Sequence, residues 1–202
     1  MAFSKIAAEN LGGSALPAIS GASLTGISSG LVYINGVTIT SSTASATIDS
    51  CFSSTYRNYM IFWDCTGTEQ RDLMFRFRTG GSDDDSNGYN WGASGIDKDA
   101  SSETSYGNAQ TAIQVGHGQY SNTDVDNPTS HGIFEVINPS STTHNKILQM
   151  QFTTYNSNGD IRSYSGGGYY LRQPAVDGIK FYYASTGNVF NATVKVYGLV
   201  NS

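Results

Sequence analysis

Two bulky segments, Tyr59–Cys65 and Leu73–Arg78, constrain the fold of this chain most strongly. Successive side chains of an extended strand point to opposite faces. The first segment is largely apolar on both faces, which is typical of a central strand covered on two sides. The second alternates apolar with mostly basic residues, which indicates a half-buried strand with a cationic outer face. With residues 66–71 as the turn, the two segments are predicted to form a hairpin at the centre of the core.

The remainder of the sequence from residue 31 onward also favours β structure. Short alternating runs recur roughly every 10–20 residues, separated by turn dipeptides such as Asn35-Gly36 and Asn138-Pro139. No stretch keeps a helical period over ten residues. We therefore expect an all-β fold, an antiparallel two-sheet sandwich of the jelly-roll type. Its predicted core includes Trp63, Phe75, Leu148, Met150, Phe152, Ile179 and Phe181.

Residues 1–30 differ from this body, which we place at 31–202. Single large aliphatic residues are spaced there among Gly, Ser, Ala and Pro; they are Leu11, Leu16, Ile19, Leu24 and Ile27. Within one chain these five have no shared face. They could pack against copies of themselves or along another protein, or the segment could be a flexible linker. A linker has no need of five large aliphatics, so we expect an extended N-terminal arm for attachment or trimerisation.

Composition limits the functions that need to be considered. Only 13% of the 202 residues are charged, about half the usual share. The net charge of −5 and the pI near 5.0 argue against a nucleic-acid partner. Residues 1–10 hold no apolar run long enough for a signal peptide or a membrane span. We expect a protein kept in a cytoplasm or released from it by a route such as lysis, with no membrane partner.

The segment Gly80–Asn108 is a long polar excursion with a short strand expected at 89–92. Its three adjacent acids, Asp83 to Asp85, offer oxygen ligands for calcium, but neighbouring side chains diverge and a solvated loop tip explains them as well. The three histidines, His117, His131 and His144, lack metal-ligand spacing. No cofactor or metal is therefore expected.

Catalytic and glycan-binding constellations can also be sought. A glycosidase needs two facing carboxylates, and nothing in the sequence indicates that Asp64 and Glu135, the acids inside strand patterns, converge. Four aromatic residues of the polar segments could form a sugar-stacking platform or could simply anchor loops: Tyr89, Trp91, Tyr106 and Tyr120. The two cysteines, Cys51 and Cys65, are expected to be buried free thiols, although a bridge between them is open.

Two parts of the chain resemble proteins of tailed bacteriophages. The first is residues 1–13 together with Leu-Pro-Ala-Ile-Ser-Gly-Ala-Ser-Leu-Thr-Gly-Ile at 16–27, which resembles N-terminal segments of phage fibre and decoration proteins. The second pairs Phe52–Tyr59 with Gly187–Leu199, which ends in Lys-Val-Tyr-Gly-Leu and resembles small phage virion proteins. About half the chain is covered, and residues 81–130 match nothing.

The resemblance implies a non-enzymatic virion component, assembled in a host cytoplasm. It would be a homotrimeric capsid decoration or a fibre part that contacts other virion proteins of the capsid or tail. A glycan- or receptor-binding module of a tail fibre, with a host-surface glycan as partner, is the alternative.

Overall fold

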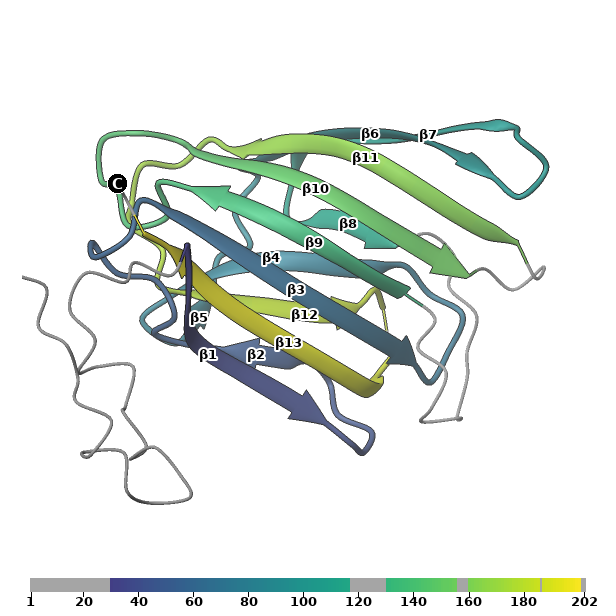
Figure 1. The fold of residues 1–202 in the computed structure, drawn as a ribbon, viewed down its shortest axis with the longest axis horizontal. Helices are drawn as coiled ribbons and strands as arrows, with labels where there is room; N and C mark the ends of the chain where they lie inside the picture. Colours follow the sequence, from purple (N-terminus) through teal and green to yellow (C-terminus); the bar gives the residue numbers. More distant parts are fainter. Residues whose placement is uncertain (1–29, 117–129, 156–159, 186, 201–202) are drawn as a thin grey trace, which may run out of the picture.

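The computed structural model describes residues 30–116, 130–155, 160–185 and 187–200, which form strands and no helix. Figure 1 looks onto the larger of two sheets, with the smaller sheet behind it. The strands are β1 (Leu31–Ile39), β2 (Ala46–Ile48), β3 (Asn58–Gly67), β4 (Leu73–Thr79), β5 (Ser82–Asp83), β6 (Tyr89–Asp97), β7 (Ser102–Gln110), β8 (Ile113–Gly116), β9 (Ser130–Ile137), β10 (Lys146–Tyr155), β11 (Ile161–Tyr170), β12 (Gly178–Tyr183) and β13 (Val189–Leu199).

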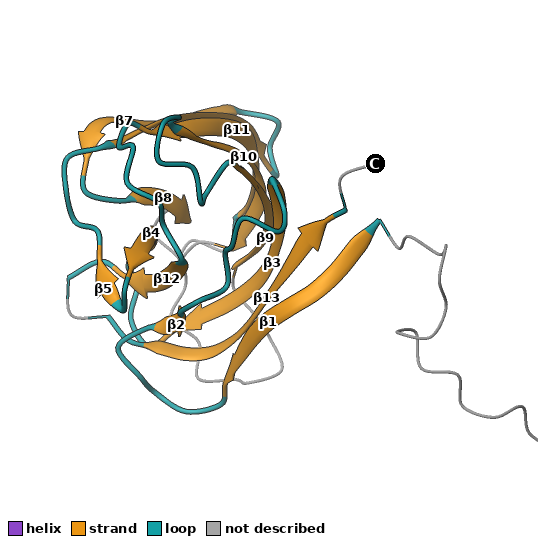
Figure 2. Cartoon of the chain, turned by 90° about the vertical axis from the view of Figure 1, so that its left-hand side faces the viewer, coloured by secondary structure: helices purple, strands orange, loops and turns teal. Residues whose placement is uncertain are grey.

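The large sheet has eight strands in the order β1-β13-β3-β9-β10-β11-β6-β7, and every pairing is antiparallel. The small sheet runs β2-β12-β4-β5, and β8 also pairs with β4. Figure 2 shows the large sheet curving around the small one. The expected all-β, antiparallel two-sheet sandwich is thus confirmed.

The core forms where the inner faces of the two sheets meet. In β10, Leu148, Met150 and Phe152 are buried and alternate with the exposed Gln149 and Gln151, as the sequence predicts. All seven residues predicted for the core belong to one buried cluster. That cluster extends from Ala46 to Val196, with Ile34, Val37 and Ile39 of β1 packed against it. The predicted arm, 1–30, lies outside the described residues apart from Gly30.

The predicted central hairpin is wrong, because β3 and β4 belong to different sheets. β3 pairs with β13 and β9, whereas β4 pairs with β12 and β8. The connection at 68–72 crosses from one sheet to the other. The outer side of β3 is also not covered within the described chain, since Phe62 is 38% exposed. Alternation reveals a buried side but not the partner strand.

One glycine-containing segment also differs from expectation. Asn35-Gly36 does not turn the chain but lies inside β1, beside a register shift. Glycine is needed at position 36 for close approach, because a Cβ there would lie 2.8 Å from the carbonyl oxygen of Val194. The glycine run at 166–168 does not interrupt its strand, since β11 is continuous through it.

The polar excursion is more ordered than predicted. Instead of one short strand at 89–92 it contains β6 and β7, two nine-residue strands that pair as a hairpin at the edge of the large sheet. Ser, Gly, Asn and Thr occupy many of their positions, and such residues have low strand propensity or none of the bulk that marks an alternating pattern.

A buried lysine fixes one corner of the sandwich. The ammonium group of Lys146 donates hydrogen bonds to the carbonyl oxygens of Ser141 (2.7 Å), Gln173 (2.9 Å), Arg172 (3.1 Å) and His144 (3.4 Å). Burial lowers its pKa below the usual value. The four carbonyls satisfy the ammonium group and join the β9–β10 loop to the segment that follows β11.

The two faces of β3 allow a matched test of the core. Trp63 is 3% exposed and contacts Phe134 and Phe181, whereas its neighbour Phe62 points outward. Trp63→Ala should lower the free energy of unfolding by about 3–5 kcal/mol, because it leaves a cavity between the sheets. Phe62→Ala should cost less than about 1 kcal/mol in the isolated chain. Equal losses in chemical denaturation would contradict this assignment of the two faces.

Candidate functional site

The candidate functional site is an open groove on the outer face of the large sheet, the face turned away from the small sheet. It consists of two adjoining hollows of about 940 and 620 Å³. Both are lined by Ile133, Gln151 and Ser165, so they form one continuous depression over β9, β10 and β11. The larger hollow continues over β6 and β7.

Small side chains at alternate positions create the floor of the groove. On β11 the outward residues Ser163, Ser165 and Gly167 follow one another, and on β6 the residues paired with the last two are Ser94 and Gly92. A Cβ on Gly92 would meet no atom within 4 Å. The depression is therefore formed by missing side-chain volume on two adjacent strands.

Glycine is also required beneath this floor. A Cβ added to Gly166 would collide with the carbonyl oxygen of Gly92 and with Ala93, so the close approach of β11 to β6 depends on it. The Gly166–Gly168 run thus has two roles in forming the groove. It lets the strands pair closely, and it leaves the outer surface bare at Gly167.

Larger side chains border the floor on both sides. On one side are Ile133 of β9 and Phe62 of β3, whose ring packs edge-on against Tyr197 at 5.6 Å between ring centroids. On the other side Ile96 is 58% exposed and Tyr106 is 82% exposed. The groove therefore has a hydroxyl-rich floor and apolar or aromatic margins.

A row of polar residues crosses the groove at one end. Asp64, His131, Thr153 and Ser163 are register partners on four adjacent strands. The hydroxyls of Thr153 and Ser163 are hydrogen-bonded at 3.1 Å, and Asp64 accepts from the backbone N–H of Thr193. Burial raises the pKa of Asp64. Within the described residues no hydrogen bond joins His131 to Asp64 or Thr153, so the row lacks the linked base and nucleophile of a triad.

The two strand acids do not meet. Asp64 and Glu135 are on adjacent strands and share the outer face, but Glu135 is opposite Met60, four residues along β3 from Asp64. That offset corresponds to roughly 13 Å along the strand, beyond the usual separation of paired catalytic carboxylates. Glu135 instead accepts a hydrogen bond from Asn58 at 3.0 Å.

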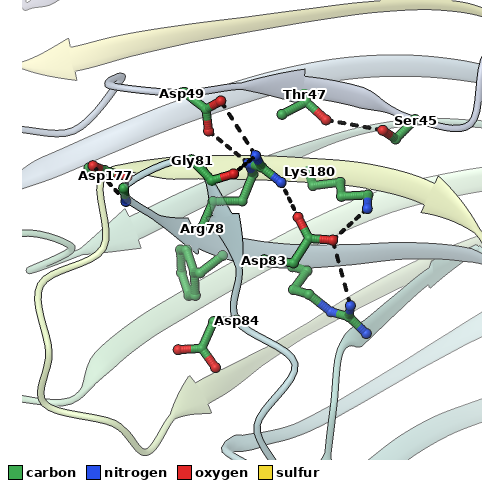
Figure 3. Close-up of polar contacts among 12 residues, drawn as sticks. Ser45, Thr47, Asp49, Arg78, Gly81, Asp83, Asp84, Asp177 and Lys180 are labelled. Carbon is green, nitrogen blue, oxygen red and sulfur yellow. Dashed lines mark hydrogen bonds and ion pairs between the residues drawn. The ribbon is translucent and has the colours of Figure 1, made fainter.

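The three consecutive acids, Asp83 to Asp85, do not form one ligand set. Asp83 lies on the outer face of the small sheet, where it pairs with Arg78, Lys180 and, at 3.8 Å, Arg76 (Figure 3). Asp84 turns away and accepts hydrogen bonds from Ser86 and from the hydroxyl of Tyr170. No cluster of three metal-ligating acid, histidine or cysteine side chains occurs in the described parts of the chain.

The Asp83 cluster fastens the β4–β5 turn to the small sheet. Arg78 also contacts Asp49 at 2.7 Å and the carbonyl oxygen of Gly81, so one guanidinium joins the end of β2 to the turn. Burial tends to raise the pKa of Asp83, but the hydrogen bond and charge of Lys180 and the two arginines outweigh it and lower the pKa. The sequence prediction of a cationic outer face on β4 is confirmed, and the cationic groups of this face form ion pairs with Asp49 and Asp83 of the same chain.

The predicted aromatic platform is not assembled. Tyr89 is fully buried, and its hydroxyl accepts from the N–H of Phe77 and donates to the carbonyl oxygen of Asp84. Trp91 is 8% exposed and also belongs to the core. The expectation of exposed stacking rings is therefore wrong for these two, because both point to the inner face of β6. Tyr106 is exposed at the groove margin, and Tyr120 lies outside the described residues.

The remaining residues named from the sequence are the two cysteines, two of the histidines and the aliphatics of the arm. Cys51 and Cys65 are buried free thiols, as expected, and burial raises the pKa of Cys51 to about 12. His144 makes hydrogen bonds with Ser141 and Thr143. His117 and the five arm residues Leu11, Leu16, Ile19, Leu24 and Ile27 fall outside the described part of the chain.

Sequence reasoning missed the groove itself. Its floor is Ser163, Ser165, Gly167 and Ser94, residue types that carry no chemical motif. The available signal is that small residues occupy the alternate positions 163, 165 and 167 of β11, which leaves the middle of one face of the strand bare.

Comparisons with known proteins leave the family open. No family model matches the sequence, and no curated protein matches it significantly. In the portion of the chain that the structure describes, no helix has the length and apolarity required to cross a membrane.

The charge cluster predicts a pH dependence. Because the pKa of Asp83 is lowered on folding, its stabilising effect is present above the ordinary aspartate pKa of about 3.9 and is lost as the pH falls below that value. Asp83→Asn should reduce the free energy of unfolding by about 1–3 kcal/mol at pH 7, and the difference from the unsubstituted protein should narrow below about pH 4.

The neighbouring Asp85 supplies the control for that measurement. It is exposed, so Asp85→Asn should change stability by less than about 0.5 kcal/mol at either pH. Urea unfolding of both variants across the pH range tests the assignment. If Asp83→Asn and Asp85→Asn behaved alike, the cluster would have no role in holding the turn.

Proposed function

We propose that this chain is a non-enzymatic structural protein of a bacteriophage virion, a homotrimeric decoration or fibre component attached to the particle through residues 1–30. The resemblance of the segments 16–27, 52–59 and 187–199 to phage virion proteins supports the proposal. The protein would assemble in the host cytoplasm and contact other virion proteins of the capsid or tail.

The observation that carries the attachment role is the extent of the core. The buried cluster is supplied by residues 46–196, with β1 packed against it. The described body also closes on itself at its ends, since the N–H of Val200 donates to the carbonyl oxygen of Gly30 at 3.2 Å. The described residues thus build a packed core of their own. Leu11, Leu16, Ile19, Leu24 and Ile27 lie outside them, and in the proposed assembly these aliphatics contact other chains.

Attachment by such a segment is favourable only in an assembly. Fully burying one Leu or Ile contributes roughly 1.5–3 kcal/mol, whereas ordering each backbone residue costs about 1–2 kcal/mol. The five aliphatics in a segment of about twenty residues cannot offset that cost alone. Contacts that extend along the whole segment, as between symmetry-related copies, add the apolar area that is needed.

A glycan- or receptor-binding module is the second candidate. The observation that favours it is Tyr106, which is 82% exposed and lies on β7 two residues from Thr104, a residue that lines the groove. An exposed aromatic ring next to hydrogen-bonding side chains suits a sugar. Host-surface polysaccharide that bound the protein, and bound Tyr106→Ala more weakly, would favour this candidate.

Deletion tests the attachment role. A chain that lacks residues 2–29 should fold with an unchanged unfolding midpoint, because the core lies within the body. It should be monomeric in light scattering where the full chain is a trimer, and it should no longer join virions in a complementation assay. Full incorporation of the truncated chain, or a full chain that is monomeric at every concentration, would contradict the proposal.

A further inference from the structure

The exposed large hydrophobic residues of the described chain are concentrated on one face. All but Leu171 point outward from strands of the large sheet, as their register with Phe62 shows. They are Leu31, Tyr33, Phe62, Ile96, Tyr106, Tyr155, Ile161 and Tyr169. Single exposed apolar residues are ordinary, but a face that collects nearly all of them marks an interaction surface.

The same face carries little charge over its four strands β10, β11, β6 and β7, and the acids that line the groove are Glu103 and Glu135. The outward positions of β10, β11, β6 and β7 are filled by hydroxyl, amide, aliphatic and aromatic side chains or glycine, and none is Asp, Glu, Lys or Arg. Depletion of charge around aromatic residues is typical of the buried centre of a protein–protein interface. A neutral, partly apolar partner therefore fits this surface better than an ionic one.

Residues 10–29 of the chain have the matching chemistry. They contain no charged residue, and their large aliphatics are separated by Gly, Ala and Ser. Bulky side chains at intervals along a thin backbone suit a groove whose floor is Ser and Gly and whose margins are Phe62, Ile133 and Ile96. Each surface supplies what the other lacks: side-chain volume on the segment and open space on the sheet.

The position where the described body begins is also suitable. Gly30 precedes β1, an outer strand of the large sheet, and Leu31 and Tyr33 already point to the same face as the groove. From β1 to β11 there are five strand spacings, roughly 24 Å, and twenty extended residues span up to about 66 Å. A segment leaving one copy can therefore cross to the groove of the next.

We propose that the groove of each copy holds residues 10–29 of a neighbouring copy in the assembled protein. This rests on the proposed function, since it identifies the surface on which the attachment segment packs. Exchange between copies closes naturally in a cyclic trimer, in which every copy gives one segment and receives one. With the segment in place, both faces of β3 are covered, which fits a strand whose two faces are both largely apolar.

Disulfide trapping between full-length chains tests the proposal. One set of chains carries Ser165→Cys on the groove floor, and a second set carries Leu16→Cys, Ile19→Cys or Leu24→Cys. The two sets are mixed, reassembled and mildly oxidised. Cys51 and Cys65 are buried and will not compete. Thr79→Cys, at the exposed end of β4 in the small sheet, is the matched control for the groove position.

We expect at least one segment position to form a covalent dimer with Ser165→Cys at more than tenfold the yield obtained with Thr79→Cys. Yields equal to the control would overturn the proposal. A third chain that carries both substitutions reports on contact within one copy, and linkage found only in that chain would also overturn the proposal. A disulfide between two Ser165→Cys chains would overturn it as well, because it indicates that the large sheets of two copies pack face to face. Protection of Ser165→Cys from a maleimide only after addition of host polysaccharide would assign the groove to a glycan instead.

The mass of the full-length protein separates this inference from the proposed function. A trimer that requires residues 2–29 but gives no groove linkage leaves the function standing and removes the docking surface. A monomeric chain without linkage removes both.

Discussion

An aromatic cluster that joins the two sheets is the contact on which the rest of the structure depends. Trp63 and Phe134 of the large sheet meet Phe75 and Phe181 of the small sheet, with ring centroids 5.0–6.1 Å apart. Because side chains alternate along a strand, burying this set fixes the outward direction of every neighbouring residue. Phe62 and Arg76 point to opposite outer faces for the same reason.

The two outer faces of the sandwich differ in how their outward side chains are paired within the chain. On the small sheet, Arg76, Arg78 and Lys180 meet Asp83 within the chain, and Arg76 and Lys180 also lie over the ring of Tyr182. On the large sheet Tyr33 and Phe62 pack on the ring of Tyr197. The outward positions of β10, β11, β6 and β7 hold no Asp, Glu, Lys or Arg. The outer face of the small sheet is thus held by ion pairs within the chain, whereas the outer face of the large sheet is the proposed docking surface.

Sequence patterns predicted much of the fold and little of the site. The strand Lys146–Tyr155 was predictable because bulky and amide residues alternate strictly, and the core residues followed from the same pattern. The pairing of β3 was not predictable, because register partners 65 or more residues away leave no local signal. The groove was missed because small residues such as Ser165 and Gly167 create it by their lack of side-chain volume. Tyr89 was misjudged because its small neighbours concealed the inner face of β6.

Hydroxyl-radical footprinting of the assembled full-length protein tests most directly whether the outer face of the large sheet is covered. Phe62 and Tyr106 report on that face, and Leu171, which is 47% exposed and does not belong to it, is the internal reference. The account predicts that both aromatics oxidise several-fold more slowly in the assembled protein than in the chain lacking residues 2–29, with Leu171 unchanged. Equal oxidation of Phe62 and Tyr106 in the two samples would contradict it.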